Sequence, residues 1–245
     1  MQQELISPLS PASPTLPEDL HLRSIQQFAQ LILLLVNIVQ GISLSVLAQK
    51  VVDLKISSIA DYSIYLRIVA SLIMIWFVTF QYAVVVVTLW FASNGIRDIL
   101  FILIFGIAEY GAMYSVPDAD KWLLWVTAMT AFGVPCFLST NAHAAKMIKK
   151  LPHPTLIETK RKTIQNLVNV FICGAVLLGL CTTQYTLPNV WTYMKRNYMD
   201  YIIPLFITVY SVCILWRDSR FIDRVVIPSQ KSAVRDDPDP LRGGV

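Results

Sequence analysis

The sequence predicts an all-α, polytopic integral membrane protein, a six-helix transmembrane bundle with short loops. The chain has 245 residues, of which 55% are hydrophobic and only 15% are charged, whereas an ordinary soluble domain carries about 25% charged residues. The mean hydropathy is +0.56. The apolar residues gather into six runs, and a helix needs about 20 predominantly apolar residues to cross the hydrocarbon core. This composition excludes a disordered chain and a disulfide scaffold, and it argues against a soluble domain.

The positions of the six helices follow from the distribution of charge along the chain. We expect helices at residues 24–48, 64–92, 98–116, 121–146, 163–187 and 198–218. The first lies in the uncharged stretch between Arg23 and Lys50, and the second begins near Arg67, the last charged residue before Arg97. The apolar run of the third helix contains a single charged residue, Glu109.

The last three helices rest on the same argument. No Lys, Arg, Asp or Glu occurs between Lys121 and Lys146 or between Lys162 and Lys195, and the sixth run covers residues 201–216. Turn-forming residues separate the helices: Ser93-Asn94-Gly95, Pro117-Asp118, residues 151–154 and Pro188-Asn189. The first of these predicts a tight hairpin of the second and third helices, and the last predicts a loop before the sixth.

The distribution of Lys and Arg predicts the orientation. Six crossings place both termini on one side, and that side carries fourteen of these residues against five on the other. Because basic loops of membrane proteins stay in the cytoplasm, we expect cytoplasmic termini, in a plasma membrane or a bacterial inner membrane. Residues 1–22 should form a disordered tail, and residues 219–245 a short basic segment followed by a second disordered tail.

Familiar catalytic and cofactor-binding motifs are missing from the sequence. No GxSxG, HExxH or TVGYG motif occurs, so the common intramembrane proteases and potassium-channel filters are not indicated. The four cysteines lie inside apolar runs without metal-ligand spacing: Cys136, Cys173, Cys181 and Cys213. We therefore expect no enzyme activity and no cofactor, and the net charge of +4 does not favour nucleic acid.

Two ionisable residues lie inside predicted membrane helices. Arg67 and Glu109 are each a few residues from the same predicted end of the bundle, and the hairpin should bring their helices together. An unpaired charge at this depth is costly, so such residues usually pair or face water. We predict that the two groups approach within salt-bridge or one-water distance, either as an ion or substrate site or as a structural ion pair. Arg67 alone would instead extend its side chain to the headgroups.

Further polar residues follow helical spacing. Gln81 shares a face with Arg67, and Asn37 belongs to a polar stripe on the first helix. Tyr110 and Tyr114 are close enough in sequence to donate hydrogen bonds to Glu109. On the fifth helix, Asn166 shares a face with two later polar positions. These stripes indicate either an aqueous pathway or hydrogen bonds between helices.

Small residues form close-packing ridges on two helices. Ala108 and Ala112 are four residues apart in the third helix, and Ala175, Gly179 and Thr183 repeat the same spacing in the fifth. Membrane helices associate through such surfaces, within one chain or between copies of it. Residues 146–162 form a basic loop that would bind anionic lipid or a cytosolic partner, or would serve only as the orientation signal.

Three classes of function are compatible with these features. The first is a membrane subunit or scaffold that acts through partners or as a homo-oligomer in the lipid bilayer. The second is a small channel or transporter that uses Arg67 and Glu109, and the third is an intramembrane enzyme of an unfamiliar type. A polar cavity around Arg67 and Glu109 would favour the second over the first.

Overall fold

The computed structural model describes residues 16–54, 62–89, 96–150 and 154–223, and these are helical apart from short connections. Six long helices carry the fold: α1 (Leu16–Asp53), α2 (Tyr62–Leu89), α3 (Ile96–Tyr114), α4 (Ala119–Lys150), α5 (Pro154–Thr186) and α7 (Asp200–Phe221). Between α5 and α7 lie the short helix α6 (Pro188–Met194) and the π-helical segment η2 (Lys195–Met199). The predicted all-α class is confirmed for the described residues.

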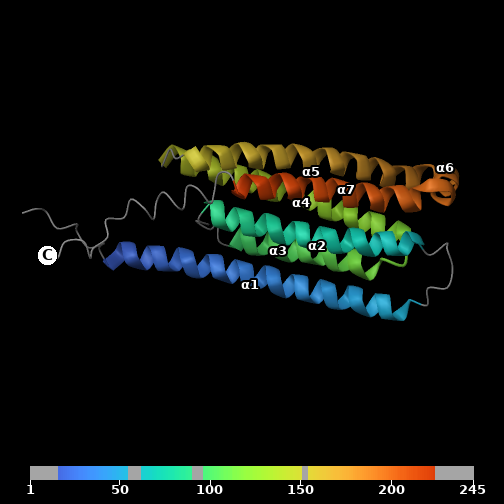
Figure 1. The fold of residues 1–245 in the computed structure, drawn as a ribbon, viewed down its shortest axis with the longest axis horizontal. Coiled ribbons are helices and arrows are strands. Elements are labelled where there is room, and N and C mark those ends of the chain that lie inside the picture. Colours follow the sequence, from blue (N-terminus) through green and yellow to red (C-terminus); the bar gives the residue numbers. More distant parts are fainter. Residues whose placement is uncertain (1–15, 55–61, 90–95, 151–153, 224–245) are drawn as a thin grey trace, which may run out of the picture.

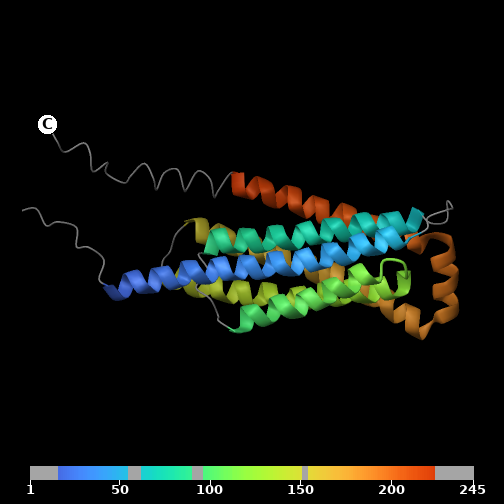
Figure 2. The same ribbon diagram turned by 90° about the horizontal axis from the view of Figure 1, so that it is seen from below.

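The long helices run alternately up and down one common axis, so α1 begins and α7 ends at the same end of the bundle (Figure 1). We call this the Asp218 end, because Asp218 lies in the last turn of α7. The opposite end is the Asp120 end, after the residue near the start of α4. There α6 and η2 cross the bundle instead of following its axis (Figure 2).

Five helices are long and apolar enough to cross a membrane. The apolar stretches are Gln30–Asp53, Tyr62–Tyr82, Ala119–Lys146, Ile157–Thr186 and Asp200–Phe221. In α3 the apolar stretch, Ile99–Tyr114, is shorter. The side chains that point outward from these helices are largely apolar, as expected for a surface that contacts lipid.

The helix neighbours differ from those expected for a tight α2–α3 hairpin. Helix α3 packs mainly against α1 and α4 and touches α2 much less, while α2 packs against α7 and α1. Two glycines explain the closeness of α3 to its neighbours. A side chain at Gly106 would meet Val39 of α1 at 2.6 Å, and one at Gly111 would meet the Trp125 ring of α4 at 2.3 Å. The turn at residues 93–95 lies outside the described residues.

Several helix ends differ from the predicted ones. Helix α1 begins at Leu16, within the predicted tail at residues 1–22. Pro17 is tolerated there because the first turn needs no backbone N–H donor. The loop expected at Pro188-Asn189 is instead α6, since proline is equally suited to a first helical turn. The basic segment 146–162 is also helical on both sides of residues 151–153.

Candidate functional site

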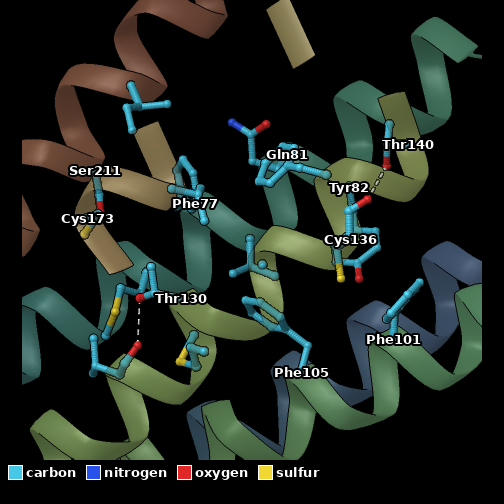
Figure 3. Close-up of a pocket in the computed structure, with 18 of the residues that line it drawn as sticks. Phe77, Gln81, Tyr82, Phe101, Phe105, Thr130, Cys136, Thr140, Cys173 and Ser211 are labelled. Atoms are coloured by element: carbon cyan, nitrogen blue, oxygen red, sulfur yellow. Dashed lines mark hydrogen bonds between the residues drawn. The ribbon is translucent and has the colours of Figure 1, made fainter. Parts of the chain in front are cut away.

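An apolar cavity of about 160 Å³ lies inside the bundle between α2, α4, α5 and α7, with α3 and one residue of α1 closing its side (Figure 3). Its wall consists mainly of aromatic, aliphatic and sulfur-containing side chains from all six long helices. Among them are Met74, Phe77, Phe105, Met129, Cys173 and Ile207. Half-buried members such as Phe101 and Thr140 lie toward the Asp218 end.

The polar side chains of this wall carry hydroxyl and amide groups and one imidazole, that of His143. Ser211 of α7 and Thr130 of α4 carry hydroxyl groups, and the Thr130 hydroxyl donates a hydrogen bond to the carbonyl oxygen of Val126 at 2.8 Å. No Asp, Glu, Lys or Arg is among the lining residues that the structure describes. The cavity therefore suits an uncharged, hydrocarbon-rich molecule.

Gln81 connects this cavity to a buried polar cluster at the Asp218 end. Its amide nitrogen donates to Asp218 Oδ2 at 2.6 Å, and its amide oxygen accepts from Asn166 Nδ2 at 3.1 Å. Asn166 also donates to Asp218 Oδ2 at 3.0 Å. The amides thereby hold one oxygen of a carboxylate that is only 2% exposed.

The other oxygen of Asp218 accepts from two cations. Lys162 Nζ lies 2.8 Å from Oδ1 and Arg217 Nε lies 3.3 Å from it. Arg217 also donates to Asn166 Oδ1. This cluster joins α2, α5 and α7, and a second, much smaller cavity lies beside it. Because both carboxylate oxygens have partners, the cluster is a satisfied buried network.

Arg67 and Glu109 form no direct ion pair in the part of the chain that the structure describes, and each has a different partner. Arg67 is 3% exposed and donates from Nε to the carbonyl oxygen of Val116 at 2.8 Å, in the turn after α3. Glu109 precedes Val116 by seven residues and lies about two helical turns deeper. It faces α1, because α3 packs on α1 instead of α2. Neither residue lines the two cavities described above.

The partner of Glu109 is Gln40 of α1, which sequence reasoning missed. Gln40 Nε2 donates to Glu109 Oε2 at 3.0 Å, and the Glu109 side chain is fully buried. The predicted tyrosine donors point elsewhere: Tyr110 and Tyr114 are exposed and stack on each other with ring centroids 6.2 Å apart. Asn37, about one turn before Gln40 on α1, is also exposed.

The Asp120 end is closed by contacts of α6 and η2 with the start of α4. Asp120 accepts a hydrogen bond from the indole of Trp191 at 3.0 Å and pairs with Lys195 Nζ at 2.8 Å. Asp118 accepts from the backbone N–H groups of Asp120 and Lys121 at the first turn of α4. Burial opposes ionisation of Asp118, but hydrogen bonds from Lys121 and Asp120 outweigh it and hold the pKa of this carboxyl below its usual value.

The two small-residue ridges have different surroundings. Ala108 and Ala112 are fully buried between helices, which is packing within the chain. On α5, Ala175 and Gly179 are exposed and Thr183 is half-buried, and a side chain at Gly179 would meet nothing within 4 Å. This second ridge therefore faces away from the bundle.

The described residues contain no group of three or more His, Cys, Asp or Glu side chains that could hold a metal ion. The four cysteines are free thiols. Comparison with protein-family models, with curated proteins and with solved structures finds no match.

Proposed function

We propose that the chain is a six-span membrane protein that binds one uncharged, hydrocarbon-rich molecule inside its bundle. The cavity is the observation that carries this proposal. An apolar cavity of roughly 150 Å³ has room for a molecule the size of benzene. A cavity of about 160 Å³ here suits a small aromatic compound or a segment of an acyl or isoprenoid chain.

The surroundings of the cavity support this class of ligand. The wall lacks Asp, Glu, Lys and Arg among the described residues, so a charged ligand would lose its hydration without a counter-charge. The hydroxyl of Ser211 can bond a single polar group of the ligand. Sparse polar groups in an apolar wall are typical of sites that orient a mainly hydrophobic ligand.

Binding can be measured with an uncharged fluorescent polyene added to the purified protein in detergent micelles. We expect saturable fluorescence with one probe for each chain, and competition by unlabelled hydrocarbons. Ser211→Phe fills the cavity and should abolish the saturable component, whereas Val212→Phe, on the exposed face of the same helix, should preserve it. Equal partitioning into all three proteins would contradict the proposal.

The six-span topology and its orientation form part of the proposal. Helix α3 has 19 residues, which span about 28 Å at 1.5 Å per residue, close to the thickness of the hydrocarbon core. The alternating helices and the excess of Lys and Arg at the Asp218 end support cytoplasmic termini, in a plasma membrane or a bacterial inner membrane. The basic residues of 146–162 at this end also suit contact with anionic lipid.

Cysteine-accessibility labelling in intact cells tests this topology. Cysteines placed at both termini and within 151–153 should be protected from an impermeant reagent, whereas one placed within 55–61 should react. Termini that react differently from each other would require an odd number of crossings.

A second candidate function is that of a membrane scaffold or subunit that assembles with copies of itself. The outward-facing ridge of Ala175, Gly179 and Thr183 supports it, because close helix contacts in membranes form on such ridges. Gly179→Ile should then convert an oligomer to monomers in light-scattering measurements, while Gly41→Ile should not. Gly41 is the matched control because a side chain there also meets nothing within 4 Å.

The second hypothesis from the sequence, a transport path through Arg67 and Glu109, has less support. The two residues bind different partners at different depths, and the cavity that would have favoured transport is apolar and lies away from both.

A further inference from the structure

The contact between α1 and α3 contains three buried oxygen atoms without a hydrogen-bond partner among the described residues. They are Gln40 Oε1, Ser43 Oγ and Glu109 Oε1. The three side chains are at most 6% exposed, and the amide nitrogen of Gln40 already binds the other oxygen of Glu109. A buried polar atom without a partner costs about 1–3 kcal/mol, so three at one contact require an explanation.

The hydrogen-bonding capacity of these atoms shows that the contact lacks a donor. A carboxylate only accepts hydrogen bonds, and the amide oxygen of Gln40 also only accepts. With both in place, the donors at the contact are the Gln40 amide nitrogen and the Ser43 hydroxyl. The single hydroxyl proton can serve only one of the two unpartnered acceptor oxygens, Gln40 Oε1 and Glu109 Oε1. One added proton on Glu109 Oε1 turns this atom into a donor, and it then has Gln40 Oε1 as an acceptor.

Among the described residues, no charged side chain pairs with Glu109, whose hydrogen-bond partner is the Gln40 amide. On α1, Lys50 lies over the Tyr114 ring at 4.1 Å; on α4, Asp120 pairs with Lys195. On α2, Arg67 binds Val116.

The remaining ionisable groups of the neighbouring helices lie farther away or have other contacts. Tyr110 and Tyr114 of α3 are exposed. Lys121 of α4 pairs with Asp118, and His143 is near the opposite end of α4. The side chains of Arg97 and Asp98 lie outside those that the structure describes.

We propose that Glu109 is a proton-binding site inside the membrane, and that the bound proton joins Glu109 Oε1 to Gln40 Oε1. The Glu109 carboxylate takes up one proton from water and becomes a neutral carboxylic acid. The acid O–H donates to the Gln40 amide oxygen while the Gln40 N–H donates to the acid carbonyl. The two side chains form a cyclic acid–amide pair that fastens α1 to α3. Ser43, three residues after Gln40 on the same face of α1, can donate its hydroxyl proton to the acid.

This site is independent of the apolar cavity. Gln40, Ser43 and Glu109 are absent from the cavity wall, so loss of ligand binding would leave the proton site in place. A neutral acid also resolves the cost of an uncompensated charge in the membrane interior.

Infrared spectroscopy of the protein in liposomes tests the proposal directly. Wild-type protein at neutral pH should show the carbonyl band of a protonated carboxylic acid, and this band should shift in heavy water. Glu109→Gln should remove it, because the amide mimics the neutral acid without carrying a titratable proton. Glu158→Gln, the matched control at the opposite end of the bundle, should leave it unchanged.

Two outcomes would overturn the proposal. A spectrum of Glu109→Gln identical to wild type would mean that Glu109 is ionised. Loss of the wild-type band when potassium is replaced by sodium would identify a metal-cation site at the same oxygens instead.

A stability measurement shows whether the Glu109→Gln variant is folded. Glu109→Gln should unfold at a temperature close to that of wild type at neutral pH, because an amide pairs with Gln40 in the same way. As the pH rises, wild type should lose its proton and its stability, while the variant should not. A parallel decline of both proteins would contradict the proposal.

Discussion

At the scale of single residues, two buried ionisable side chains bind partners that their positions in the sequence do not reveal. Arg67 and Glu109 lie on the two helices expected to form a hairpin, yet one binds the Val116 carbonyl and the other binds Gln40. A charged side chain in a membrane bundle bonds to whichever segment packs against its face.

The separation of these two residues leads to a first prediction. Arg67→Met and Glu109→Gln should have additive effects on the free energy of unfolding, within about 0.5 kcal/mol, because the two side chains share no partner. The measurement is a double-mutant cycle in one detergent. A larger coupling energy would show that the two side chains interact directly, which would contradict the structure.

The Asp218 cluster was only half visible in the sequence. Gln81 and Asn166 stand out as polar residues in apolar runs, but Asp218, Lys162 and Arg217 fall at the ends of the runs. At such positions, charged residues are usually solvated. Only the packing of α2, α5 and α7 shows that Asp218 is 2% exposed and that its carboxylate therefore requires hydrogen-bond donors from the protein.

At the scale of helices, the distance to the neighbouring helix decides which glycines are required for stability. Gly111→Ala should destabilise the protein by about 1–3 kcal/mol, because its added carbon would meet the Trp125 ring of α4 at 2.3 Å. Gly179→Ala, where nothing lies within 4 Å, should change stability by less than about 0.5 kcal/mol. Thermal unfolding of both variants in the same micelles provides the comparison, and equal effects would contradict the assigned α3–α4 contact.

The segment formed by α6 and η2 should depend on Asp120. Asp120→Ala removes the acceptor for Trp191 and the ion-pair partner of Lys195, so the amides of residues 188–199 should exchange hydrogen about tenfold faster, which corresponds to about 1.4 kcal/mol. Lys121→Met is the control, since its ion pair with Asp118 is exposed and worth little. Unchanged exchange in Asp120→Ala would show that Asp120 does not anchor this segment.

Hydrophobic periodicity predicts helices well but their ends poorly. Five apolar runs form helices long enough to cross a membrane, and α3 is a shorter one. Backbone N–H and C=O groups in lipid must bond to each other, and an α-helix satisfies them within one segment. The helix at Pro188 was missed because proline both interrupts helices and begins them.

At the scale of the whole molecule, the packing order of the helices creates a feature that no local pattern predicts. Helix α3 lies against α1 and α4, and the apolar side chains between α2, α4 and α7 leave a cavity of about 160 Å³. The residues of its wall are spread over the entire chain from Ile32 to Ile214. Only a tertiary arrangement brings them together, so sequence analysis had no signal for this site.

Native mass spectrometry of the purified protein tests most directly whether this cavity holds a ligand. After removal of loosely held lipid, wild-type protein should retain one uncharged, hydrocarbon-rich molecule for each chain, and Val212→Phe should retain the same molecule. Ser211→Phe should appear without it, at the mass of the chain alone. A wild-type protein that carries no bound molecule, or a Ser211→Phe variant that carries as much as wild type, would contradict the account.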